Sequence, residues 1–304
     1  MPRTIYNRFF IAMALITSLV LLVWIAGTKV GAQSTLTGDW TANVSKDKDK
    51  LNLNMERRSD KGGRHQMGHD YDFSDFQGLT REQALNGGPV SFSLIREAGR
   101  IDLEGSFQNG KGSGTFRFTA NAGFVSAMKS RGFDFEQVYD DDERRSENRL
   151  FSAAALNITT ALADDLSSAG FGKLGVEDLF KAAIFKINST FMREMKASGF
   201  NLGMEDLVKA RIFKIDPEFV RQVSQMGFEK EPFESLVKMQ IFKVTPEFVT
   251  EMRNEGLNDM AIEDLVKLRI FKIDTAFIRE AKADGVPLEV ERLVQRKIGV
   301  ARRH

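Results

Sequence analysis

The chain of 304 residues contains no cysteine. This absence excludes disulfide bonds, thiolate metal ligands, a cysteine nucleophile and a lipid-anchored cysteine, so the fold depends on burial of apolar side chains. Histidine is also scarce: only His65 and His69 precede the C-terminal His304. Because histidine is the most frequent general base and a common metal ligand, its scarcity disfavours most catalytic and metal sites.

Neither sign of charge is in excess, since 43 basic residues face 42 acidic ones and the net charge is +1. Phosphate binding needs a basic surplus, so nucleic acid is not expected as a partner. The chain also has no HExxH, GxSxG, P-loop or glycine-rich dinucleotide motif. We therefore expect no enzyme and no cofactor, although sequence pattern alone does not test for paired carboxylates.

The one long apolar run lies at the N-terminus, from Phe9 to about Gly27, after the basic residues Arg3 and Arg8. Small residues at Val30-Gly31-Ala32 stand at the usual cleavage distance. Residues 1–32 are thus predicted to be a signal peptide or an uncleaved N-terminal membrane anchor. Either interpretation places the rest of the chain outside the cytoplasm, in the periplasm or attached to the membrane.

Residues 33–119 alternate apolar and polar side chains with a period of two, as in Leu51, Leu53 and Met55. Turn-rich segments separate these stretches, among them Asn86–Pro89 and Asn109–Gly114, and Ala98-Gly99-Arg100 is predicted to be a tight hairpin. We expect five or six antiparallel strands that form a small sandwich or partial barrel.

Two short patterns in this region suggest ligands. Gly38-Asp39-Trp40 resembles the opening motif of lipocalins, but a tryptophan that anchors one end of a core explains it better. His65 and His69 could share a metal if they lay on a helix. The surrounding glycines instead favour a loop entering a strand, where the two would be about 13 Å apart. We therefore predict no metal site.

Residues 120–304 form a tandem repeat of about 29 residues, marked by Gly170, Gly199, Gly227, Gly256 and Gly285. A fixed period of this size is typical of a solenoid. In one copy, Asp216 and Pro217 start a helix with an apolar stripe, and Gly227 ends it. A second predicted helix carries the stripe Phe233, Leu236, Val237 and Ile241.

Each repeat is therefore predicted to be a helical hairpin, with about six hairpins in all. The first copy is divergent: its helices are expected near residues 124–132 and 148–156, separated by an insertion that includes the acidic cluster Asp140–Glu143. We interpret that cluster as solvated. Glutamate and lysine four residues apart, as in Glu205 and Lys209, predict ion pairs within each second helix.

One lysine recurs in each of four repeats after the second helix, and these residues are Lys186, Lys214, Lys243 and Lys272. Two interpretations are open. The lysines can simply complement the carboxyl end of each helix, or they can form a row that binds a partner.

The segment Glu205–Arg221, with the sequence EDLVKARIFKIDPEFVR, resembles a repeat of exported or membrane-attached bacterial proteins, notably acidobacterial ones. The repeat also occurs in extracytoplasmic extensions of membrane metallopeptidases similar to β-lactam sensors. The similarity covers about residues 90–298. It implies sensing or interaction and no defined activity, and peptidase activity does not carry over because this chain lacks the metal motif and the multi-pass membrane region.

The sequence thus predicts an α+β protein in which an antiparallel β domain precedes an α-solenoid of helical hairpins. We expect an exported, non-catalytic scaffold whose partner is a protein or cell-envelope component, with membrane contact only through residues 1–32. The competing hypothesis is a small-molecule carrier or sensor with a pocket in the β domain.

Overall fold

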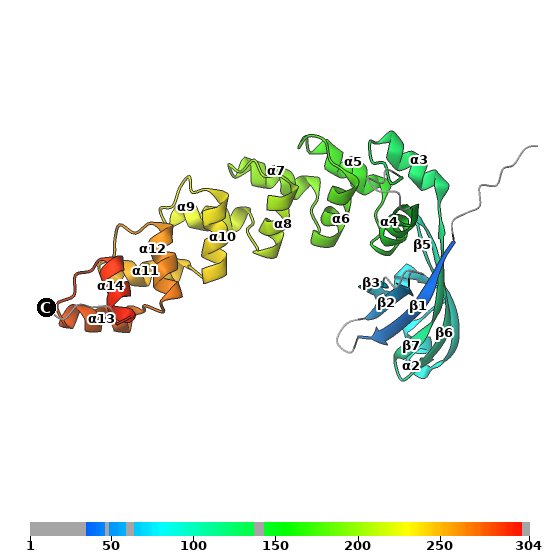
Figure 1. Cartoon of the computed structure of the whole chain (residues 1–304), viewed down its shortest axis with the longest axis horizontal. Coiled ribbons are helices and arrows are strands. Elements are labelled where there is room, and N and C mark those ends of the chain that lie inside the picture. Colours follow the sequence, from blue (N-terminus) through cyan, green and yellow to red (C-terminus); the bar gives the residue numbers. More distant parts are fainter. Residues whose placement is uncertain (1–34, 46–48, 59–63, 137–142, 300–304) are drawn as a thin grey trace, which may run out of the picture.

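A computed structural model describes residues 35–45, 49–58, 64–136 and 143–299. A curled antiparallel sheet stands at one end of the molecule, and a row of helical hairpins extends away from it (Figure 1). The α+β class and the order of a β domain followed by helical repeats are as the sequence predicts. The predicted leader at residues 1–32 and the acidic residues 140–142 lie outside the described residues.

The described sheet has seven strands in the order β3-β2-β1-β7-β6-β5-β4. All described pairings are antiparallel, and the sheet curls into a half-barrel. The strands are β1 (Thr35–Val44), β2 (Lys50–Arg58), β3 (Arg64–Asp72), β4 (Phe76–Gln77), β5 (Gly88–Arg96), β6 (Gly99–Gln108) and β7 (Lys111–Ala120). The predicted partial barrel is therefore the form adopted, and the alternative of two stacked sheets is wrong.

Glycines on the inner face of the sheet allow its strong curl. Gly105 and Gly114 are opposite each other on β6 and β7. A Cβ on Gly114 would lie 1.9 Å from the carbonyl oxygen of Glu104, so only glycine lets the two backbones approach so closely. Gly38 plays a similar part beside Phe116, whose ring occupies the space that a side chain would take.

Large side chains fill the concave side. Trp40 is 1% exposed, lies against the rings of Phe92 and Phe107, and donates its indole N–H to the carbonyl oxygen of Glu104 at 3.1 Å. This confirms Trp40 as a core anchor.

Two details of the sheet differ from the expectation. A helix, α2 (Arg81–Asn86), and a short 3-10 turn, η1 (Phe73–Asp75), interrupt the region that was expected to be all strand. The predicted turn Asn109–Gly114 is also too long, because β7 begins at Lys111 and the turn is only Asn109-Gly110, with φ of 51° and 75°. Such a two-residue turn matches the twist of a hairpin.

Twelve helices follow in the described residues and form six hairpins. The first helix of each hairpin belongs to the row α3 (Ala122–Ser130), α5 (Thr160–Ser168), α7 (Ser189–Ala197), α9 (Pro217–Gln225), α11 (Pro246–Asn254) and α13 (Thr275–Ala283). The second helices are α4 (Glu143–Ala155), α6 (Val176–Phe185), α8 (Met204–Ile212), α10 (Phe233–Phe242), α12 (Ile262–Ile270) and α14 (Val290–Lys297).

The predicted start and stop signals are confirmed. The side chain of Asp216 accepts a hydrogen bond from the N–H of Phe219 at 2.8 Å, which caps α9. Asn188 and Asp274 cap α7 and α13 in the same way. The glycine after each first helix has a positive φ, for example 90° at Gly227, so it ends the helix in the left-handed conformation.

Charged side chains connect each second helix to the next one along the stack. Lys209 bonds Glu234 at 2.6 Å and Lys238 bonds Glu263 at 3.0 Å. The expectation that these lysines pair with the glutamate four residues earlier on their own helix is wrong. The pairs that follow this pattern are Arg149–Glu177, Lys181–Glu205, Lys209–Glu234, Lys238–Glu263 and Lys267–Glu291, which we call the inter-repeat ladder.

The first hairpin packs directly on the sheet. The ring of Phe151 in α4 stacks on Phe116 with centroids 5.2 Å apart, and the hydroxyl of Tyr71 donates to the carbonyl oxygen of Ala155 at 2.9 Å. Burial raises the pKa of Tyr71, so this hydroxyl stays protonated and remains a donor. The β domain thereby covers the end of the array.

Candidate functional site

The four recurring lysines stand directly after the second helices, in the left-handed backbone conformation. Their φ angles are 54°, 56°, 54° and 51° at Lys186, Lys214, Lys243 and Lys272, and all four side chains are exposed. Asn157 holds the same conformation after α4, and Gly299 holds it after α14. A lysine in this conformation is less favourable than glycine by about 1–2 kcal/mol, so the recurrence of lysine points to a use for its side chain.

None of these four amines forms an ion pair or hydrogen bond with any residue that the structure describes. The lysines of the inter-repeat ladder, by contrast, each have a glutamate partner. The backbone at the exposed lysines is held in place, since the carbonyl oxygen of Lys186 accepts from Arg211 at 2.9 Å and that of Lys214 accepts from Gln240 at 3.3 Å. The stack therefore positions four uncompensated cations.

An exposed isoleucine lies two residues before each lysine. Only seven large apolar side chains are exposed in the described part of the chain, and five of them occupy this one position of the repeat. Their exposed fractions run from 48% to 54%, and the residues are Ile184, Ile212, Ile241, Ile270 and Ile298. We call the five isoleucines together with Lys186, Lys214, Lys243 and Lys272 the Ile–Lys stripe.

The sequence pattern placed Ile241 in the buried stripe of its helix, and this is wrong, because the side chain is 48% exposed. Val244, which follows the end of α10, is buried instead at 2% exposure. The recurring triplet Ile-Phe-Lys was a sequence signal for this exposure. Its phenylalanine is half-buried and the apolar residue after the lysine is buried, so these two side chains already supply the apolar contacts.

At its β-domain end the stripe meets a depression of about 640 Å³ between strand β3 and the first hairpin. Lys186 lines this depression together with Asp70, Asp72 and Asp75 of the β domain. Asp72 pairs with Lys50 at 3.0 Å and Asp75 pairs with Arg96 at 2.8 Å, so the depression holds charges of both signs. The β domain lies away from the later repeats (Figure 1).

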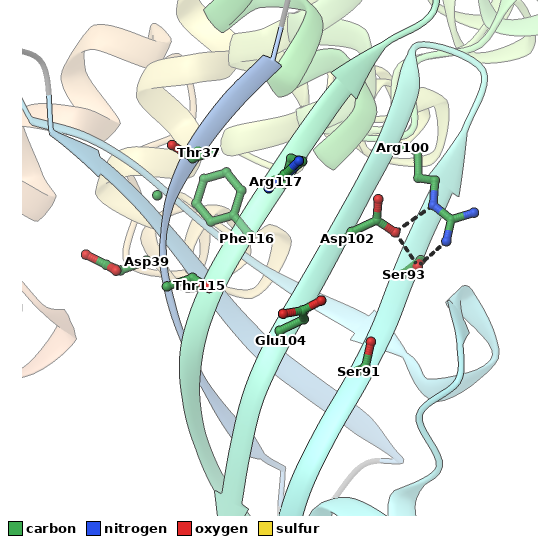
Figure 2. Close-up of a pocket in the computed structure, with 11 residues that line it drawn as sticks. Thr37, Asp39, Ser91, Ser93, Arg100, Asp102, Glu104, Thr115, Phe116 and Arg117 are labelled. Atoms are coloured by element: carbon green, nitrogen blue, oxygen red, sulfur yellow. Dashed lines mark hydrogen bonds and ion pairs between the residues drawn. The ribbon is translucent and has the colours of Figure 1, made fainter.

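A second depression, of about 720 Å³, lies over the outer face of the sheet. Figure 2 shows that its charged side chains project from neighbouring strands, with Ser93, Arg100 and Asp102 joined to one another. Ser93 donates to Asp102 at 2.7 Å, and Arg100 donates to both, at 2.6 Å to Asp102 and 2.9 Å to Ser93. Partial burial opposes ionisation of Asp102, but these hydrogen bonds outweigh it and lower its pKa. Asp102 is thus ionised at neutral pH.

The structure places His69 on strand β3 rather than in a loop, and its ring contacts that of Tyr71. The side chain of His65 lies outside the described part. No group of three or more potential metal ligands occurs among the described residues. Within the same residues, no helix has both the length and the apolar content needed to span a membrane.

The chain matches no protein-family model, no curated protein and no solved structure. The resemblance to exported bacterial repeat proteins therefore stays a prediction.

Proposed function

We propose that this protein is a non-catalytic scaffold that binds a protein or cell-envelope component through the Ile–Lys stripe. The observation that carries the proposal is the isoleucine at the same exposed position of five successive repeats. Isolated exposed apolar residues are common on protein surfaces, but a contiguous apolar row is typical of an interaction site. The neighbouring lysines give such a site its charge.

A purely structural role explains the lysines but not the isoleucines. A cation near the carboxyl end of a helix is stabilising by about 0.3–1 kcal/mol, which offsets part of the cost of its left-handed backbone. An isoleucine that is half exposed gains little from burial, and a polar residue there would be better solvated. Glutamate occupies the other strongly exposed position of the same helices, as at Glu205 and Glu263. Partner binding accounts for both residue types.

The packing of the β domain supports the scaffold over the carrier hypothesis. A carrier needs an apolar cavity behind the strands. The inward-facing side chains instead contact one another, with Leu53, Leu94 and Leu103 all fully buried beside Trp40. The depression in Figure 2 lies on the outer face and is lined largely by charged and hydroxyl side chains, which suits a small apolar cargo poorly.

The test compares what the full chain retains from an envelope extract before and after the lysines are neutralised. The variant Lys186→Asn, Lys214→Asn, Lys243→Asn and Lys272→Asn keeps a residue type that the fold already accepts in this conformation at Asn157. A control with equal charge change replaces four exposed lysines outside the stripe by Asn, at Lys111, Lys173, Lys196 and Lys230. We expect retention to fall only in the stripe variant, with unchanged helical content and melting. Full retention by the folded stripe variant would contradict the proposal.

Export is the second element of the proposal, supported by the basic residues and apolar run of residues 1–32. If this segment is a cleaved signal peptide, N-terminal sequencing of the periplasmic protein will begin at Gln33. Recovery of the intact segment in the membrane fraction would instead establish a membrane anchor. Recovery of the whole protein from the cytoplasm would contradict export.

A further inference from the structure

We infer that the partner of the Ile–Lys stripe is a protein segment in which acidic and apolar residues both face the stripe. This inference rests on the proposed function and gives the chemistry of the partner. It excludes basic segments and neutral polymers as ligands, and it favours a protein over a lipid surface.

The acidic character follows from the charges that the stack leaves unpaired. The inter-repeat ladder neutralises its own lysines with glutamates of the next repeat. The lysines of the stripe have no such partner within the described residues, so their charges are available to a ligand. The isoleucines beside them require apolar groups on the same ligand, since burial of apolar surface accompanies most stable contacts.

The chain itself supplies an example of such a contact at the start of the stripe. In the first hairpin, Ala155 and Asn157 occupy the positions that Ile184 and Lys186 hold in the second. There the β domain contacts this position of the repeat, with Tyr71 hydrogen-bonded to Ala155 and the carboxylates of Asp70 and Asp72 in the adjoining depression. A strand with aromatic and acidic side chains, of which Asp72 is paired with Lys50, thus lies where the stripe begins.

The later repeats present the same surface without that cover. The β domain lies at one end of the array and the hairpins extend away from it (Figure 1). Lys214, Lys243 and Lys272 therefore do not adjoin the depression that Lys186 lines. On these later repeats the partner makes the contact that the β domain makes on the first hairpin, and it places its own acidic residues opposite these three lysines. A protein surface, strand β3, already occupies this position in the first hairpin, which favours a protein segment over a flat anionic membrane as the ligand.

The test uses three fluorescently labelled peptides that differ only in chemistry. The first repeats the unit Asp-Asp-Leu-Leu. In an extended chain alternate residues share a face, so both faces of this peptide carry acidic and apolar side chains. The second peptide replaces Leu by Ser and the third replaces Asp by Lys. The full chain is titrated with each, and we expect binding of the first alone, weakened as salt is raised.

Two variants locate the binding. Lys214→Asn, Lys243→Asn and Lys272→Asn together should weaken binding of the Asp/Leu peptide by about tenfold. A second triple variant should also weaken binding of the Asp/Leu peptide by about tenfold, but without changing its salt dependence. It carries Ile212→Gln, Ile241→Gln and Ile270→Gln. The matched control, Lys111→Asn, Lys173→Asn and Lys230→Asn, should bind as the parent chain does. Equal binding by the parent and both stripe variants would overturn the inference.

Vesicles of anionic and of neutral phospholipid form the last arm, with the same variants. We expect neither vesicle to retain the chain. If anionic vesicles bind in a stripe-dependent way and the peptides do not, the acidic-segment inference is wrong while the stripe remains a binding site. If stripe-dependent binding is seen only with the Lys/Leu peptide, the inferred sign of charge is wrong. If no probe binds and the stripe variants retain as much from envelope extract as the parent chain does, both the inference and the proposed function are wrong.

Discussion

Glycine serves different purposes in the two halves of the molecule. In the half-barrel it makes room: a Cβ on Gly105 would lie 2.1 Å from the carbonyl oxygen of Ser113, and one on Gly38 would lie 2.3 Å from that of Glu56. In the array the glycines after the first helices have more room: a built Cβ would meet no backbone atom within 4 Å at any of them, and its nearest neighbours are side-chain atoms at 3.6 Å for Gly227 and 3.3 Å for Gly256. At Gly199 no heavy atom lies within 4 Å of a built Cβ, but φ is 93°. The sheet therefore needs glycine for close approach, and the stack needs it for backbone conformation.

The difference follows from how each region is held together. The sheet is closed by pairings between distant segments, such as β1 with β7, so one enlarged residue disturbs a shared core. Each hairpin of the array packs mainly on its neighbours, so the effect of a substitution stays local. Substitutions should therefore be more damaging in the sheet than in the array.

The largest effect is expected for Gly114→Ala, which would place a methyl group 1.9 Å from the Glu104 carbonyl oxygen. The strands must separate to accept it, and we expect a loss of about 3 kcal/mol or more, or failure to fold. Gly68→Ala is the matched control, because Gly68 is also in a strand but its nearest atom would be 3.5 Å away. Urea unfolding followed by the fluorescence of Trp40, in a Trp24→Phe background, measures both. Similar stability for the two variants would contradict the close-approach argument.

A smaller loss is expected where only backbone conformation is at stake. Gly227→Val and Gly199→Val place a β-branched residue at φ of 90° and 93° and should each destabilise the array by about 1–3 kcal/mol. Gly203→Ser is the control, since Gly203 has an ordinary φ of −75° at the start of α8, where serine is a good cap. Circular dichroism during urea unfolding compares them. Gly110, at φ of 75° in its two-residue turn, should respond like Gly227.

A pH-dependent effect is expected at Glu255, which joins α11 to α13. Its carboxylate accepts from Lys282 at 2.9 Å and from Arg279 at 2.7 Å, and these hydrogen bonds lower its pKa. A lowered pKa in the folded state contributes stability that is present above the ordinary value of about 4.3 and is lost as pH falls through the folded value. The melting temperature of the parent chain should therefore exceed that of Glu255→Gln at pH 7, and the difference should vanish in acid. A difference that does not change with pH would contradict this account.

Most of the fold was accessible from the sequence because its signals are local. Three signals act within a few residues: the period of two in the strands, the caps at Asp216 and Asp274, and the helix-ending Gly227. The period of about 29 residues is longer, but it can be read directly from the sequence. The choice between sandwich and half-barrel was not accessible. It depends on Gly105 facing Gly114 across β6 and β7, a register that only the folded sheet defines.

The proposed binding surface was only half predicted for a similar reason. The lysines were found by their recurrence, but Ile241 was assigned to the core because helical periodicity does not show how far the neighbouring helices cover a helix. The partner of Lys209 was also misassigned. Glu205 on the same helix was expected, whereas the lysine reaches Glu234 of the next repeat, a contact that depends on how hairpins stack.

The smallest effect on stability is expected for substitutions of the stripe lysines, and these substitutions test whether the left-handed backbone conformation determines which residues are tolerated there. For Lys214→Gly, relief of a left-handed backbone opposes two losses, namely the greater freedom of glycine in the unfolded chain and the missing charge at the end of α8. The gain of about 1–2 kcal/mol and the two losses, each of about 0.3–1 kcal/mol, nearly cancel, so we expect a net change within about 0.5 kcal/mol. Lys214→Val removes the same charge but keeps the strain of a β-branched residue at φ of 56°. It should be less stable than Lys214→Gly by more than about 1 kcal/mol in urea unfolding. If the two variants unfold at the same urea concentration, the left-handed conformation does not account for the row, and the placement of the lysines along the stripe loses its structural basis.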